Sequence, residues 1–213
     1  NDIYVNIAKG FREGNANRPI PLTPCVVSTC PGSLQSLGLT SVPSTYSPDS
    51  LWNYEVGDKA RLFDRRLSID SALFYMDWSK LQQSVALPGG YSFFTNTGSA
   101  RVYGAELDAK ARPTDNLTLG ISGNYTHARI SSTTLVNGIG PGSPIPGVPT
   151  WSATVNSEYR WPVGNDAHAF VKGAWYFTGP SHGTFFANQP DFDRPSYSIG
   201  NASAGMSFGN VTL

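Results

Sequence analysis

Two cysteines, Cys25 and Cys30, stand in the segment PCVVSTCP and are the residue pair in this sequence best suited to covalent chemistry. Their spacing fits either a small disulfide-closed loop or half of a metal site. No second cysteine pair or histidine lies nearby, so a metal site is the weaker interpretation. We expect a disulfide formed in an oxidising compartment, with two free thiols as the alternative.

The histidines and acidic side chains show no catalytic arrangement. His127, His168 and His182 are far apart in the sequence and fit no metal-binding motif. Glu106 and Asp108 stand two residues apart, so on a strand they share one face, where a water-exposed wall accounts for them better than acid–base catalysis does. The glycine-rich segments follow no phosphate-binding pattern. We therefore expect neither an enzyme nor a bound metal or cofactor.

Aromatic side chains in or near the long loops are the best candidates for binding a ligand by stacking. These candidates, with one histidine near the outer end of a strand, are Trp52, Tyr91, Phe93, Phe94, His182 and Phe185. The same aromatic side chains are equally suited to a rim at a membrane surface, and the histidine to a solvated rim. The chain has 15 basic and 15 acidic residues, and this neutral balance does not indicate a nucleic-acid partner.

Residues 102–110 alternate cleanly between apolar and polar positions. Tyr103 points to one side and Glu106 to the other, which is the period of a strand with one face in water. Similar runs predict about eight strands: 3–11, 51–60, 67–78, 102–110, 117–127, 151–161, 169–177 and 197–208. No stretch has convincing helical periodicity; SLQSLGL (33–39) is short and interrupted by glycine. The sequence therefore predicts an all-β fold.

The connections between these strands alternate between long and short. Long connections are predicted at 13–50, 79–95, 129–149 and 178–194, with short turns between them. An antiparallel up-and-down transmembrane β-barrel has this arrangement, with long extracellular loops at one end and short periplasmic turns at the other. The chain has no 18-residue apolar run and hence no predicted transmembrane helix. It starts within a strand pattern, and we expect it to be a fragment.

The segment from Trp151 to Trp161 predicts which face lies in lipid. Ten residues separate the two tryptophans on one apolar face, or about 33 Å along a strand. Tilted by about 40°, that length covers roughly 25 Å of membrane normal, the height of the apolar band of an outer-membrane barrel. The opposite face is polar and could not fill a dry core. A soluble barrel with the apolar residues inside remains the alternative.

Four segments, in order, resemble the C-terminal β-barrel region of TonB-dependent outer-membrane receptors. They are IYVNIAKGFREGNANRP (3–19), residues 53–83 with NYEVGDK and LFYMDW, residues 96–128 with NTGSARVYGAELDAK, and GVPTWSATVNSEYRWP (147–162). The resemblance implies that residues 1–213 are part of a receptor barrel domain. It also implies that the plug domain and the final strands are absent from this chain.

Three backbone positions gain an expected role from the same resemblance. Gly98 resembles the glycine at which a strand of the family starts after an outer loop. Gly104 is expected on the lumen face, where a missing side chain allows the close approach of another backbone. Pro113 is expected to end the ladder at a periplasmic turn, where its missing N–H is tolerated.

The function implied by the resemblance is TonB-energised uptake across the bacterial outer membrane. The nutrient would be scarce, such as an iron–siderophore complex, and this chain would supply barrel wall and outer loops. The implied partners are outer-membrane lipid, the receptor's own plug domain, TonB acting through the plug, and the small-molecule ligand. Two alternatives stay open: a standalone eight-stranded outer-membrane barrel with a structural or passive role, and a soluble β-barrel binding module.

Overall fold

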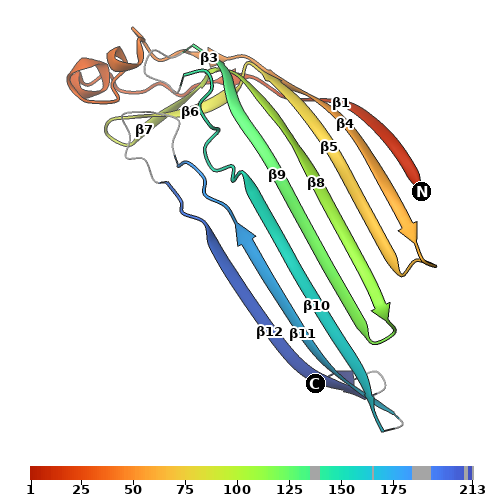
Figure 1. Cartoon of the computed structure of the whole chain (residues 1–213). Coiled ribbons are helices and arrows are strands. Elements are labelled where there is room, and N and C mark those ends of the chain that lie inside the picture. Colours follow the sequence, from red (N-terminus) through yellow and green to blue (C-terminus); the bar gives the residue numbers. More distant parts are fainter. Residues whose placement is uncertain (135–139, 165, 184–192, 209–210, 213) are drawn as a thin grey trace.

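The computed structural model describes all residues except 135–139, 165, 184–192, 209–210 and 213. Its main element is one antiparallel sheet in which each strand pairs with the next in the order β1-β4-β5-β8-β9-β10-β11-β12-β13 (Figure 1). The strands are β1 (Asp2–Arg12), β4 (Asp49–Leu62), β5 (Leu67–Ser79), β8 (Gly98–Thr114), β9 (Leu117–Thr133), β10 (Trp151–Val163), β11 (Ala167–Thr178), β12 (Tyr197–Phe208) and β13 (Val211–Thr212). The predicted all-β, up-and-down arrangement is confirmed.

Two of the predicted long loops contain secondary structure that the sequence analysis did not predict. Residues 13–50 contain a two-stranded pair, β2 (Asn15–Ala16) with β3 (Thr45–Tyr46), a π-helical turn (Cys25–Thr29) and a 3₁₀ turn (Gln35–Leu37). Residues 79–95 overlap the hairpin of β6 (Gln82–Leu87) and β7 (Tyr91–Asn96). Both helical turns are short, five and three residues, and the prediction of an all-β fold holds. None of the helices in the described part of the chain could cross a membrane.

The register of the sheet sorts side chains onto two faces, as the alternation predicted. On the face called here the apolar face, Val155 lies between Ile121 of β9 and Trp175 of β11. On the other, the polar face, Glu106 lies between Ala72 of β5 and Asn124 of β9. Successive side chains of a strand point to opposite faces. These pairings therefore determine on which face each remaining residue of the regular ladders lies.

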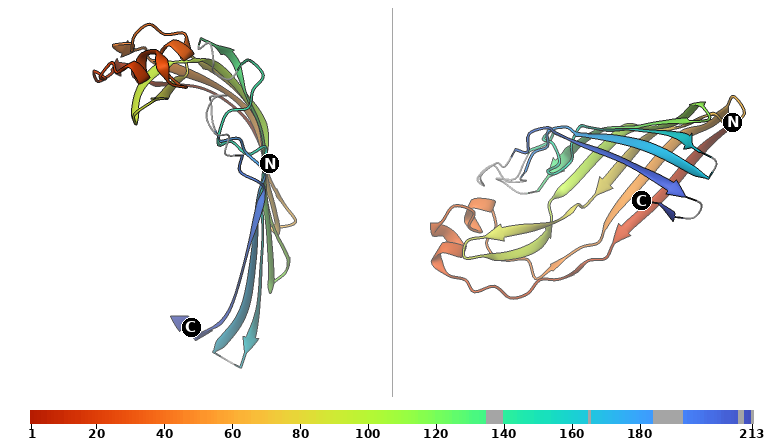
Figure 2. Two further views of the ribbon diagram at one scale, coloured as in Figure 1. Left: turned by 90° about the vertical axis from the view of Figure 1, so that its left-hand side faces the viewer. Right: turned by 90° about the horizontal axis from the view of Figure 1, so that it is seen from below.

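The sheet is open and curved. Figure 2 shows it bent like part of a cylinder wall, with the orange helical segment reaching over the concave side. β6 belongs to the loops on the concave side, and its first residue, Gln82, is hydrogen-bonded to Asp49. Asp49 also binds Trp78 and lies on the polar face. The polar face is therefore the concave one. Within the described residues β1 pairs only with β4, and β12 only with β11 and β13. A closed eight-stranded barrel is therefore not what this chain forms.

Two glycines allow close backbone approaches within β8. Gly98 begins the strand with φ +135°, and a Cβ there would lie 2.0 Å from the carbonyl oxygen of Ser132. At Gly104 a Cβ would lie 2.0 Å from the carbonyl oxygen of Tyr125 and 2.6 Å from the ring of Phe74. The expected close approach at Gly104 is therefore present. The space that a side chain at position 104 would occupy is filled by the Phe74 ring of the neighbouring strand β5.

Replacing Gly104 by alanine is expected to destabilise the barrel by about 1–3 kcal/mol, the usual cost of overpacking. The new methyl group would meet a backbone oxygen that the ladder holds in place. The matched control is Gly123→Ala on β9, where a Cβ meets only the Ser152 carbonyl oxygen, at 3.8 Å. Denaturant unfolding of the full-length receptor in detergent micelles measures both. Equal midpoints for the two variants would contradict the overpacking.

The ends of β8 and β9 depart from the predictions in two details. β8 continues one residue beyond Pro113, to Thr114, but the register shifts between Ala111 and Thr114. The proline therefore lies in an irregular stretch just before the turn, where no regular ladder bond needs its N–H. β9 is also longer than predicted, because it continues to Thr133.

Candidate functional site

The loops at the end of the sheet opposite the short turns form a packed unit with a small apolar core. We call residues 20–42 together with β6 and β7 the cap. Its buried core residues are Val26, Leu34, Leu37, Val85, Leu87 and Phe93. Ile20, Leu39 and Val42 pack against this core from the rim. The core joins two loops that are separated in the sequence by β4 and β5, and it gives them one fixed arrangement.

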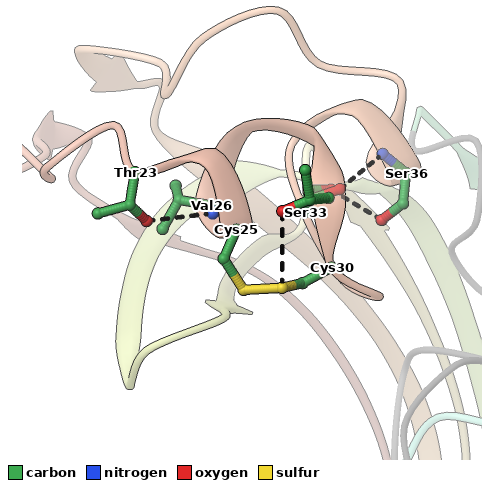
Figure 3. The surroundings of a disulfide bond; sticks show 7 residues. Thr23, Cys25, Val26, Cys30, Ser33 and Ser36 are labelled. Atoms are coloured by element: carbon green, nitrogen blue, oxygen red, sulfur yellow. Dashed lines mark hydrogen bonds between the residues drawn. A yellow bond between two sulfur atoms is a disulfide. The ribbon is translucent and has the colours of Figure 1, made fainter.

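A disulfide between Cys25 and Cys30 closes the first loop of the cap (Figure 3). The two Cα atoms are 4.8 Å apart. The backbone N–H of Ser33 donates to the Cys30 carbonyl at 3.1 Å, and that of Leu34 donates to the Val26 carbonyl at 2.9 Å. These bonds continue directly from the bridged ring into the buried core. The disulfide therefore stabilises the shape of the cap rather than that of the sheet.

Asp49 is the main polar anchor between the cap and the sheet. Its side chain is 2% exposed and accepts hydrogen bonds from the Arg12 guanidinium. It also accepts from Trp78 Nε1 at 3.0 Å and from the backbone N–H of Gln82 at 3.2 Å. Asp49 thereby ties β1, β4 and β5 to the first residue of β6. We call these four residues the Asp49 anchor.

The hydrogen-bond partners of Asp49 stabilise the ionised form of its carboxyl group. It lies three residues beyond Trp52 on β4, at the loop end of the strand. Burial by itself raises the pKa of the Asp49 carboxyl, but hydrogen bonds from Arg12, the Gln82 backbone and Trp78 outweigh burial and lower the pKa below its usual value. The carboxylate is therefore ionised at neutral pH, as an acceptor for three donors requires.

Amide side chains fix the second strand of the hairpin. Asn17 forms a two-way pair with the backbone of Phe94: its Nδ2 donates to the carbonyl and its Oδ1 accepts from the N–H, both at 2.7 Å. Asn96 donates to the carbonyls of Ser47 at 3.0 Å and Lys80 at 2.6 Å. The cap is therefore held to the sheet at both of its strands.

The candidate ligand residues fall in three different places. Tyr91 and Phe94 are exposed on β7, and the Phe94 ring packs against Tyr46 with centroids 5.4 Å apart. Phe93 is 2% exposed and belongs to the core of the cap, so its ring is not open to a ligand in this conformation. Trp52 lies on the apolar face, stacked on Tyr54. Among the described candidates, Tyr91, Phe93 and Phe94 share β7, where Phe94 points to the opposite face of the hairpin from Tyr91 and Phe93.

The remaining candidates belong to the loop after β11. His182 is exposed, and its Nδ1 lies 2.7 Å from Asp193 Oδ1. Phe185 lies outside the described residues. Tyr46 was not among the selected candidates, although it belongs to the aromatic segment TYSPDSLWNYE (45–55), and in the structure its ring lies beside Phe94.

The polar face carries a hollow of about 330 Å³ on the concave side of the sheet. Tyr4, Asp70, Glu106, Asp108 and Asn124 are among its lining residues. Asn124 donates to Glu106 at 3.3 Å. Among the described residues no group of three or more His, Cys, Asp and Glu side chains could hold a metal. The chemistry of this wall is that of a hydrated, hydrogen-bonding surface.

A curved antiparallel sheet with one apolar and one polar face, long outer loops and short turns defines a segment of a membrane β-barrel. A model of the "TonB dependent receptor-like, beta-barrel" family matches residues 2–213. The chain belongs to this family, as the resemblance in its sequence implied.

Three solved structures of outer-membrane or uptake receptors have the same fold. The ferric yersiniabactin uptake receptor FyuA of Yersinia pestis is 19% identical with a TM-score of 0.69, and 95% of this chain aligns with 27% of that one. The ferric preacinetobactin receptor BauA of Acinetobacter baumannii is 16% identical with a TM-score of 0.64, covering 97% and 27%. The pyoverdine receptor FpvA of Pseudomonas aeruginosa is 14% identical with a TM-score of 0.58, covering 98% and 27%. This chain thus spans about a quarter of their length.

Proposed function

We propose that the protein containing this chain is an outer-membrane receptor that takes up a scarce nutrient by TonB-energised transport, with an iron–siderophore complex as the ligand. The observation that carries the proposal is the family match along residues 2–213. Similar structures named as ferric-siderophore receptors favour an iron-chelate ligand over other nutrients. Binding and transport, rather than catalysis, are the proposed activities.

Residues 1–213 act in this proposal as part of the barrel domain. The apolar face contacts outer-membrane lipid, and the polar face lines a lumen that holds the receptor's plug domain. TonB acts through that plug. The support for this arrangement is the two-faced sheet and the alignment of this chain with only 27% of the FyuA chain.

The cap supplies the proposed extracellular surface for the ligand. Phe94 stands exposed beside the Tyr46 ring on one face of a hairpin that is fixed at both strands, and Tyr91 is exposed next to the turn of the hairpin. Aromatic rings that are already ordered lose little conformational entropy when a flat chelate stacks on them. His182, on the loop after β11, is the remaining accessible candidate. Trp52 is assigned to the lipid side, because it lies on the apolar face.

A deletion strain in iron-limited medium tests the proposal. We expect the loss of growth and of radioactive iron uptake on at least one member of a panel of catecholate, hydroxamate and phenolate ferric siderophores. Deletion of tonB should cause the same loss. Normal uptake of the whole panel by the deletion strain would reject the iron–siderophore ligand. Uptake that persists without TonB would reject energised transport and favour a passive barrel.

Breaking the disulfide is expected to weaken ligand binding while leaving the barrel intact. The double variant Cys25→Ser/Cys30→Ser in the full receptor should bind its ferric siderophore several-fold less tightly, because the cap must then be ordered at the moment of binding, at about 1 kcal/mol. The bridge spans five positions of sequence, and so short a ring constrains the unfolded chain little. Ligand titration and a thermal melt measure the two effects. An equal loss in both would contradict a role limited to the cap.

A further inference from the structure

An aromatic girdle runs across the apolar face near the loop end of the sheet. Its members are Trp52, Tyr54, Tyr75, Tyr103, Tyr125 and Trp151. Tyr54, Tyr75 and Tyr103 are direct cross-strand neighbours. The girdle continues as the contact between Tyr125 and Trp151, whose ring centroids are 4.5 Å apart. Tyrosine and tryptophan collect where hydrocarbon meets the head groups of a membrane, so the girdle locates this boundary.

Two arginines lie on the same face just beyond the girdle. Arg101 stands two residues beyond Tyr103 on β8, and Arg129 four residues beyond Tyr125 on β9. With strands tilted by about 40°, these steps correspond to about 5 Å and 10 Å along the membrane normal. A head-group layer is roughly 5–7 Å thick. Both guanidinium groups can therefore reach this layer, given the length of an arginine side chain.

Arg101 and Arg129 are directly opposite each other in the β8–β9 ladder. Like charges in this position disfavour the pairing of two strands. Arg101 has no ion-pair partner in the part of the chain that the structure describes, although Asp77 is its neighbour on β5. Arg129 uses Nε toward His127 Nε2 at 3.4 Å and Nη1 toward the Gly142 carbonyl at 3.3 Å. Most of the ten N–H donors are therefore free to bind an anion.

A cavity adjoins the pair on the side of Arg129, away from Asp77. Its volume is about 310 Å³, and Arg129, His127 and Arg194 are among the residues that line it. The one carboxylate in its wall, Asp193, is paired with His182 at 2.7 Å. The wall thus offers guanidinium groups to an anion, and its one carboxylate is already in contact with His182.

We propose that Arg101 and Arg129 form a binding site for the phosphate group of an outer-leaflet lipid, with the head group entering the adjoining cavity. The site lies on the apolar face, and beyond the girdle on the same face are exposed apolar side chains that acyl chains would cover, such as Leu107 and Ile121. This position favours a lipid phosphate over a free phosphate ion. The inference depends on the proposed membrane placement and is independent of the transported ligand.

Binding to the delipidated full-length receptor in nonionic detergent tests the site. The probes are dioleoyl phosphatidic acid, dioleoylglycerol with the same acyl chains and no phosphate, and inorganic phosphate. We expect saturable binding of phosphatidic acid only. The variant Arg101→Gln/Arg129→Gln should weaken it at least tenfold, because it removes two charge-assisted contacts. Phosphatidic acid binding equal to that of dioleoylglycerol, or matched by inorganic phosphate, would overturn the proposal.

The matched control is Lys110→Gln/Lys172→Gln, which removes two cations from the polar face of the same sheet. Its affinity for phosphatidic acid should equal that of the unmodified receptor, and an equal loss in both variants would refute a local site. Heat-modifiable electrophoretic mobility checks that each variant is folded. If the glutamine pair does not fold, Arg101→Lys/Arg129→Lys decides instead. That variant keeps both charges and loses the forked geometry, so a several-fold loss supports the site and an unchanged affinity rejects it.

Discussion

Replacing Val155 by arginine is expected to destabilise the barrel by about 2–4 kcal/mol, the cost of placing a basic side chain on the lipid face near mid-membrane. Val155 stands between Ile121 and Trp175 on the apolar face. It also lies between the two tryptophans of β10, Trp151 and Trp161, that mark the ends of the apolar band. An arginine side chain at this depth can reach neither head-group layer without deforming the bilayer.

The neighbouring position provides the matched control. Asn156 lies on the polar face, two residues from Glu158, whose carboxylate already pairs with Arg160 and Lys172. An arginine at 156 would stay in the hydrated lumen beside that acid, so we expect Asn156→Arg to cost much less than Val155→Arg. Denaturant unfolding of the full-length receptor in phospholipid vesicles measures the difference. Equal costs at the two positions would show that the faces are assigned incorrectly.

The strands and their facing could be predicted because each depends on local alternation. In 151–161 every second residue except Ser157 is apolar or aromatic, and a one-residue slip would turn all of them to the other face. The alternation of apolar and polar residues therefore predicts both the strand and its register with the neighbouring strands. The outer ends of β8 and β9 were less predictable, since beyond the lipid a strand needs no apolar face. Residues 128–133 accordingly continue the ladder without a clean alternation.

The cap could not be predicted from local patterns, because its core is assembled from distant segments. Val26 and Leu34 have no regular spacing, and they pack on Val85 and Phe93 some fifty or more positions along the chain. One signal was present: Pro-Gly-Gly at 88–90 stands between two short strand-like runs. Gly89 and Gly90 adopt φ of +83° and +80° in the structure, which is the backbone that such a turn requires.

The ligand candidates illustrate the same limit. Exposed aromatics could be selected from the sequence as a class, but their burial could not. Phe93 and Phe94 are adjacent in β7, so they point to opposite faces of the hairpin. Which of the two enters the core depends on the residues of 20–42 that cover one face. Only the folded cap distinguishes the buried ring from the exposed one.

Replacing Asp49 by alanine is expected to release the cap from the sheet while leaving the barrel folded. The substitution removes the acceptor for Arg12, Trp78 Nε1 and the Gln82 N–H at one position. Each buried donor left without a partner costs about 1–3 kcal/mol. Arg12 contributes least, because its side chain is 51% exposed and water can solvate it.

Hydrogen exchange of the full receptor measures this release directly. Amides of β6 and β7, beginning with Gln82, should exchange at least about tenfold faster in Asp49→Ala, which is the rate expected for a loss of 1.4 kcal/mol of local stability. Asp49→Asn keeps one oxygen acceptor and should give a smaller increase. The control is Asp115→Ala at the opposite end of the sheet, where the side chain is 86% exposed and pairs with Arg66. An exposed pair contributes little, so a cap that exchanges as fast in Asp115→Ala as in Asp49→Ala would show that Asp49 does not hold it.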